Sequence, residues 1–120
     1  DQLATSSLEG ARALAISSTD RDLSATLVDI EAMAWLGRHY ADKIRAAVSL
    51  AMLQETSDEK HRDQGVQHIT DAYNDCAKYA GISQKHYHTQ MLARPGSFDW
   101  SEMLNFVKKD IALIASWKRN

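Results

Sequence analysis

Two histidines, His86 and His88, stand two residues apart in the segment KHYH and raise the question of a metal site. Imidazole nitrogens are common zinc ligands, but helical ligands share a face only when they are three or four residues apart. On a helix, residues two apart point about 200° away from each other. His86 and His88 could bind the same metal ion only if this segment were extended. We expect a helix here and therefore predict that both histidines lie on the surface and bind no metal.

His61 and His68 are seven residues apart and can share a helix face with Asp71 or Asp75. The set lacks the tight helical array of ligands that a zinc site uses, so surface histidines are again the prediction. The chain also contains no Glu-x-x-His pair, which a di-iron bundle requires on each of two helices. We therefore expect no metal and no other cofactor.

Acid–base and nucleophilic chemistry find no support in the sequence. Asp29 and Glu31 face different directions on a helix, and no second carboxylate is fixed opposite them, so they do not define a glycosidase pair. No G-x-S-x-G elbow and no glycine-rich phosphate loop is present. The single cysteine, Cys76, is interpreted as a small core residue. We predict no catalytic residue and no enzyme activity for this chain by itself.

The length of 120 residues suits one domain with a single core, so we assign residues 1–120 to one helical-bundle domain. The net charge of −2 lacks the basic excess that nucleic acids and anionic membranes attract. No apolar run approaches the roughly 20 residues of a membrane span. Nucleic-acid and membrane partners are therefore not expected. The chain opens on Asp1 and not Met, so we expect either a removed leader or a piece excised from a longer chain.

The fold class is predicted to be all-α, because Pro95 is the only proline and β-branched residues never alternate with polar ones over a strand's length. We expect an up-down bundle of four to five helices around one long central helix, about 21–54. Asp20 and Asp99 are predicted N-caps, and Thr56 with Glu59 a capping box. The other expected helices run from Gln2 to Ile16, from Thr56 to about Ala80 with Gly81 as a left-handed cap, over the shorter segment 82–94, and from Trp100 to about Lys118.

The central helix carries apolar or small residues spaced alternately four and three apart: Leu23, Leu27, Ile30, Ala34, Gly37, Ala41, Ile44, Val48 and Ala51. This heptad seam predicts a partner helix along its whole length. The middle of the seam consists of the small residues Ala34, Gly37 and Ala41, which predicts that the closest contact between helices lies there. Gly37→Leu is therefore expected to lower the free energy of unfolding by about 1–3 kcal/mol. A second stripe predicts packing on two sides: Met33, Leu36, Tyr40, Ala47 and Leu50.

The charged back of the central helix is predicted to hold the residues that fall off the seam, which are Trp35, Arg38, His39, Asp42 and Lys43. Asp42 is spaced to pair with Arg38 or with Arg45. Exposure of Trp35 or Tyr40 would indicate a partner surface.

Three segments in order carry a resemblance: DIEAMAWLGRHYADKIRAAVSLA at 29–51, QHITDAYNDCAKYA at 67–80 and QMLARPGSFDWSEMLNFVKKDI at 90–111. The set resembles the helical region that follows the catalytic barrel in large bacterial glycoside hydrolase-like proteins, related in layout to α-glucuronidases and hexosaminidases. The likeness covers about Leu23 to Ile114. His39 stands where the first of two aromatic residues is usual, and Phe98 replaces a leucine. No catalytic residue of the family maps onto this chain.

The resemblance implies a non-catalytic accessory domain of a carbohydrate-active enzyme, whose barrel would lie upstream of Asp1. The implied partners are that barrel, carbohydrate or a second copy in a homo-oligomer, and the implied location is periplasmic or secreted. Aromatic candidates for sugar or partner contact are Trp35, Tyr40, His86, Tyr87 and Trp100.

Two alternatives belong to other classes of protein. A tetratricopeptide-like interaction module has weak support from L-G-x-x-Y at Leu36 to Tyr40, but no 34-residue repeat is present. A secreted ligand-binding bundle is the third interpretation.

Overall fold

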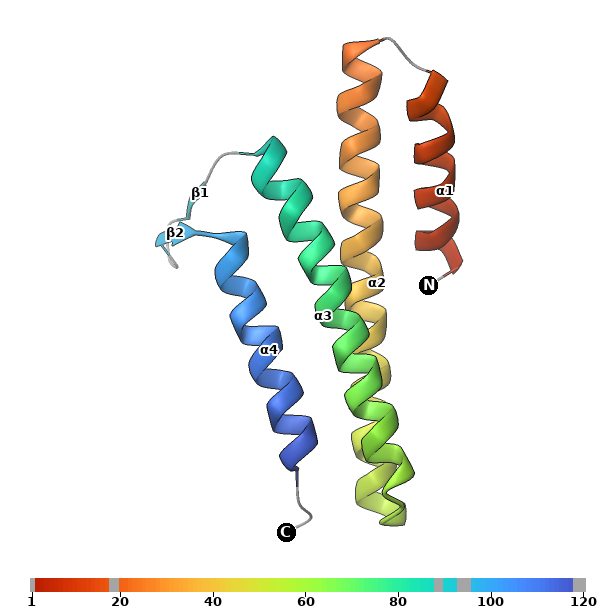
Figure 1. Ribbon diagram of the computed structural model, residues 1–120, viewed down its shortest axis with the longest axis vertical. Coiled ribbons are helices and arrows are strands. Elements are labelled where there is room, and N and C mark those ends of the chain that lie inside the picture. The colour runs from red at the N-terminus through yellow and green to blue at the C-terminus, as the bar shows by residue number, and fades with distance from the viewer. Residues whose placement is uncertain (1, 18–19, 88–89, 93–95, 118–120) are drawn as a thin grey trace.

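The computed structural model describes residues 2–17, 20–87, 90–92 and 96–117, which form four helices and one short hairpin (Figure 1). The prediction of an all-α fold with one long central helix is confirmed. The helices are α1 (Gln2–Ser17), α2 (Arg21–Thr56), α3 (Lys60–His86) and α4 (Trp100–Ser116). Strand β1 (Gln90–Leu92) pairs antiparallel with β2 (Gly96–Phe98), with Met91 opposite Ser97.

The four helices run alternately up and down, and each packs against the next one in the chain (Figure 1). Helix α2 lies between α1 and α3, and α4 packs on the other side of α3. The molecule measures 56 × 34 × 17 Å, so it is thin in one direction. A layer of this depth cannot bury every face of a central helix.

Aspartates cap two helices as predicted. Asp20 accepts hydrogen bonds from the backbone N–H groups of Asp22, at 2.9 Å, and Leu23, at 3.4 Å, at the start of α2. Asp99 accepts from the N–H of Ser101 at 2.8 Å at the start of α4. That bond to Ser101 lowers the pKa of the Asp99 carboxyl below its ordinary value.

The predicted Thr56–Glu59 capping box is wrong. Thr56 is the last residue of α2, where its hydroxyl donates to the carbonyl of Met52 at 2.7 Å. Glu59 makes no side-chain capping bond. The chain turns at Ser57, which adopts a left-handed backbone conformation with φ of 59°, and α3 begins at Lys60.

Helix α3 is longer than predicted and does not end at Gly81. It continues to His86, and the N–H of its C-cap, Tyr87, donates to the carbonyl of Ser83 at 2.8 Å. A glycine can cap a helix but does not oblige it to stop, and here the hydrogen-bond ladder continues. The short separate helix expected over 82–94 is also wrong, since residues up to His86 belong to α3 and Gln90–Leu92 is a strand. His88 and Pro95 lie outside the described residues.

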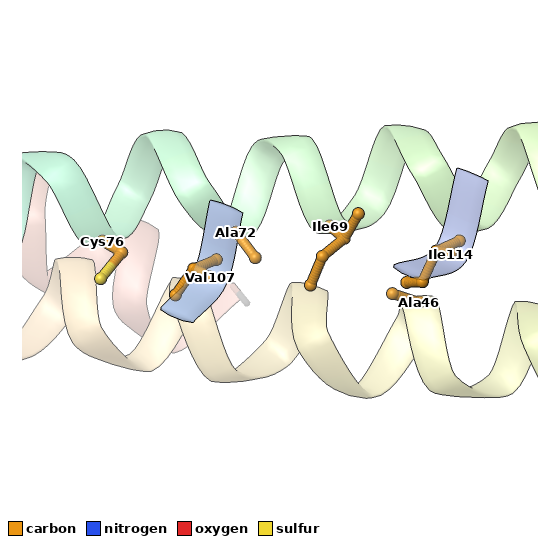
Figure 2. Packing of buried hydrophobic residues seen from close by; sticks show 6 residues of the cluster. All are labelled: Ala46, Ile69, Ala72, Cys76, Val107 and Ile114. Atoms are coloured by element: carbon orange, nitrogen blue, oxygen red, sulfur yellow. The ribbon is translucent and has the colours of Figure 1, made fainter. Parts of the chain in front are cut away.

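Two buried clusters hold the layer together. The aliphatic core joins α2, α3 and α4 and consists of Ala46, Ile69, Ala72, Cys76, Val107 and Ile114. Figure 2 shows Ile69, Ala72 and Cys76 of α3 pointing toward α2. The aromatic core lies nearer the other end of α2 and consists of Leu8, Ala32, Ala34, Trp35 and Tyr79. Cys76 is buried, as its interpretation as a core residue required.

The face of α2 that is buried is not the predicted seam. Only Leu27 and Ala34 of that seam are buried, whereas Leu23, Ile30, Ile44 and Val48 are exposed. The buried residues are instead Leu27, Ala32, Ala34, Trp35, His39, Asp42, Ala46, Ser49 and Leu53. From Trp35 onward they follow their own alternation of four and three. The assignment of Trp35, His39 and Asp42 to a charged back is therefore wrong.

Polar and small partners on α3 explain why this face is buried. His39 Nδ1 lies 2.8 Å from the carbonyl oxygen of Ala72, so the ring is satisfied inside the core. Gly65 lets the backbones approach, because a Cβ there would lie 3.5 Å from Ser49 Cβ and 3.7 Å from the Ala46 carbonyl oxygen. The close helix contact is thus at Gly65. A Cβ at Gly37 meets only Ala4, at an ordinary contact distance of 3.8 Å, so the prediction that the closest helix contact lies at Gly37 is wrong.

Candidate functional site

The charged side chains around the α2–α3 contact form a structural network. Arg38 Nε donates to Asp75 at 3.0 Å, so Arg38 pairs with α3 and not with Asp42. Arg45 donates to Asp42 at 2.7 Å, the second pair that the spacing allowed. The Asp75 side chain is almost fully buried, and its pairing removes the cost of an isolated buried charge. The Arg38–Asp75 pair thus links α2 to α3, whereas the Asp42–Arg45 pair lies within α2.

Trp35 is a buried residue surrounded by cations. The indole N–H donates to Glu31 at 3.4 Å. Lys78 Nζ lies 3.9 Å from the ring centroid, and the guanidinium carbons of Arg38 and Arg12 lie at 5.4 and 5.7 Å, within the range of cation–π attraction. Because only 6% of Trp35 is exposed, its main contacts are with the protein itself.

A basic recess of about 600 Å³ opens beside Trp35, between α1, α2 and α3. Four of its lining residues are basic, namely Arg12, Lys78, Lys85 and His86. Glu31 is the one acidic lining residue, and it already pairs with Arg12 at 3.3 Å. His86 is exposed here, with no metal-ligand group around it among the described residues.

On the side of α2 facing α4, a second recess of about 370 Å³ is lined by aromatic residues. We call it the aromatic recess, and its lining residues are Asp29, Ala32, Met33, Tyr79, Tyr87 and Trp100. The rings of Tyr79 and Trp100 meet edge to face, with centroids 4.7 Å apart and an angle of 88°. The Tyr87 hydroxyl donates to the Asp29 carboxylate, and this bond raises the pKa of Tyr87.

Exposed apolar and small residues form a stripe along α2. We call it the apolar stripe, and it consists of Ile30, Met33, Gly37, Tyr40, Ile44, Ala47, Val48 and Ala51. Met33, Tyr40, Ile44 and Val48 are each between 56% and 65% exposed. Contiguous exposed apolar surface of this kind marks interaction sites in folded proteins.

Helix α1 is too short to cover the apolar stripe. It packs on the N-terminal half of α2, and its Ala4, close to its first residue, already lies beside Gly37. From Tyr40 onward, no described helix covers the stripe. A shallow groove of about 160 Å³ continues the apolar surface from Ala47 and Leu50 to Leu113 of α4.

The structure distributes the five aromatic candidates over three places. Trp35 and His86 line the basic recess, Tyr87 and Trp100 line the aromatic recess, and Tyr40 lies on the apolar stripe. Sequence reasoning did not single out Tyr79 or the role of Asp29 beside Tyr87. The helical spacing of the stripe was visible in the sequence, but it was interpreted as buried.

Within residues 2–17, 20–87, 90–92 and 96–117, no group of three metal-binding side chains comes together. A search of the same residues finds no helix whose length and hydropathy would let it cross a bilayer. Comparison of the chain with protein-family models, with curated proteins and with solved structures finds no significant match. The site must therefore be interpreted from its own geometry.

Proposed function

We propose that this chain is a non-catalytic helical accessory domain that docks on another folded domain through the apolar stripe. The observation that carries the proposal is the exposure of Tyr40, Ile44 and Val48 in a row on one helix face. From Ile30 to Ala51 the stripe extends about 32 Å at 1.5 Å per residue. It contains no charged residue, so a partner can cover it without burying an unpaired charge.

The chemistry of the described side chains supports a binding role over a catalytic one. His39 and Asp75 are buried and held by structural partners, Ala72 and Arg38. Cys76 is buried in the aliphatic core, and burial raises the pKa of its thiol, which disfavours the nucleophilic thiolate.

The partner that we propose is the catalytic barrel of a glycoside hydrolase in the same full-length protein. The support is the resemblance of 29–51, 67–80 and 90–111 to the helical region that follows such barrels. The first of these segments also carries the whole apolar stripe, so one stretch of α2 supports both the docking surface and the parent class. Carbohydrate contact and a periplasmic or secreted location are proposed on the same ground.

The test begins with the reading frame ahead of Asp1, where we expect a long coding region for a barrel. The barrel and this chain are then produced as separate polypeptides, and their binding is measured by calorimetry. Ile44→Glu places a charge at the middle of the stripe and should weaken binding about tenfold or more, as for other central interface residues.

Asn74→Glu serves as the matched control, because it introduces the same negative charge at a residue that is exposed on α3 and lies outside the stripe. It should bind as the unchanged chain does. Equal binding by the Ile44→Glu variant would show that the stripe is not the interface. A reading frame without a barrel would contradict the proposed parent enzyme.

A further inference from the structure

The aromatic recess brings together residues that are far apart in the chain. Asp29 and Met33 come from α2, Tyr79 from α3, Tyr87 from the end of α3, and Trp100 from the start of α4. Tyr79 and Ala32 are buried, whereas Asp29 and Tyr87 at the rim are exposed. Its volume of about 370 Å³ lies within the range of small-molecule sites, about 300–1,000 Å³.

The charge of this recess has one sign. Asp29 is its one charged lining residue, and no lysine, arginine or histidine is among the described residues that line it. Aromatic rings add the negative electrostatic potential of their faces. The basic residues of this region, Arg12, Lys78 and Lys85, line the other recess. An anion is therefore disfavoured here, and a cation is favoured.

The geometry suits a cation that also has apolar surface. A cation is attracted to an aromatic face within about 6 Å of the ring centroid. Because the Tyr79 and Trp100 centroids are only 4.7 Å apart, one cation can lie within reach of both rings. An ionised carboxylate accepts at about four positions. Tyr87 occupies one position on Asp29 and orients the carboxylate, so acceptor positions remain for a ligand.

We propose that the aromatic recess binds a small alkylammonium ion, with Asp29 as the counter-charge and Tyr79, Tyr87 and Trp100 as the aromatic wall. Both a primary ammonium and a trimethylammonium group have this chemistry. The proposal goes beyond the docking function and does not depend on it. Met33 belongs to both the recess and the stripe, but Ile44, the stripe residue changed in the docking test, is about 22 Å along α2 from Asp29.

The experiment titrates the chain with choline, with its neutral carbon isostere 3,3-dimethylbutan-1-ol, with n-butylammonium and with glucose. Nuclear magnetic resonance of the indole N–H groups reports the site, because Trp100 lines the recess whereas Trp117 lies at the end of α4 and serves as an internal control. We expect the Trp100 signal to shift with choline, and choline to bind about tenfold more tightly than the isostere. Comparison of choline with n-butylammonium distinguishes methylated from primary ammonium ligands.

Asp29→Asn removes the charge with little change of shape and should weaken choline binding about tenfold. Asp22→Asn, the matched control, makes the same charge change in the first turn of α2 and should leave binding unchanged. Circular dichroism of both variants checks that the helices persist. Equal binding of choline and its isostere would overturn the proposal. A stronger Trp100 shift with glucose, or no shift with either ammonium ion, would overturn it as well.

Discussion

The two cores of this protein are built on the same helix and differ in how they are filled. Around Ala46, the helices meet through a glycine, alanines and aliphatic side chains, and the backbones approach closely. Around Trp35, large rings and long cations separate the helices, and two recesses open beside them. The tightly packed half joins α2, α3 and α4, whereas the half with bulky residues leaves recesses at its surface that are available for ligands.

Truncation of the aliphatic core should give the largest loss of stability. Ile69 is 2% exposed and lies between α2 and α4, so Ile69→Ala removes buried methyl groups and leaves a cavity. We expect a loss of about 2–5 kcal/mol in the free energy of unfolding, measured by chemical denaturation. Ile82→Ala, at the half-buried margin of the aromatic core, should cost less than half as much. Equal losses of unfolding free energy in the two variants would contradict the proposed difference in packing between the two cores.

Gly37 of α2 and Gly65 of α3 should respond differently to a large side chain. A Cβ on Gly65 would lie 3.3 Å from Ile114 Cγ2, so Gly65→Leu should overpack the contact and cost about 1–3 kcal/mol. A Cβ on Gly37 would make only an ordinary van der Waals contact with Ala4, at 3.8 Å, so Gly37→Leu should be neutral, or stabilising by up to about 1 kcal/mol, since leucine favours helix over glycine. Thermal unfolding of the two variants compares them, and destabilisation by Gly37→Leu would contradict this placement of α1.

The smallest expected effect concerns the Cys76 thiol. Burial raises its pKa above the ordinary value of 9.0, with Lys43 opposing the shift. A raised pKa means that the folded chain holds the proton more tightly than the unfolded chain. This contribution to stability is fully present below about pH 9 and is lost as the pH rises through the folded pKa.

Cys76→Ser removes the titrating thiol and should make the free energy of unfolding depend less on pH above pH 9. Urea denaturation at several pH values tests this prediction. An unchanged pH dependence would show that Cys76 does not contribute to it.

Sequence reasoning predicted the helices better than their contacts. The long central helix, the Asp20 and Asp99 caps and the burial of Cys76 all followed from local patterns. The buried face of α2 could not be predicted from local patterns. Helix α2 carries two stripes with heptad spacing, and its own sequence does not determine which of them faces a partner helix. The choice depends on α3, where Gly65 gives room and the Ala72 carbonyl satisfies His39.

The candidate recesses depend on pairs that no local pattern encodes. Tyr87 and Asp29 are 58 residues apart, and Tyr79 and Trp100, whose rings meet, belong to different helices, α3 and α4. A helix stopped at Gly81, as predicted, would have moved Tyr87 elsewhere. Tyr87 and Trp100 were named from residue type alone, whereas Asp29 and Tyr79 required the structure.

The left-handed turn at Ser57 has a consequence for how the chain folds. It reverses the chain within three residues, so α2 and α3 form a hairpin of neighbours that are close in sequence near the turn. Loops this short close quickly, and contacts between nearby residues favour rapid folding. We expect this hairpin to assemble first and to serve as the template on which α1 and α4 condense.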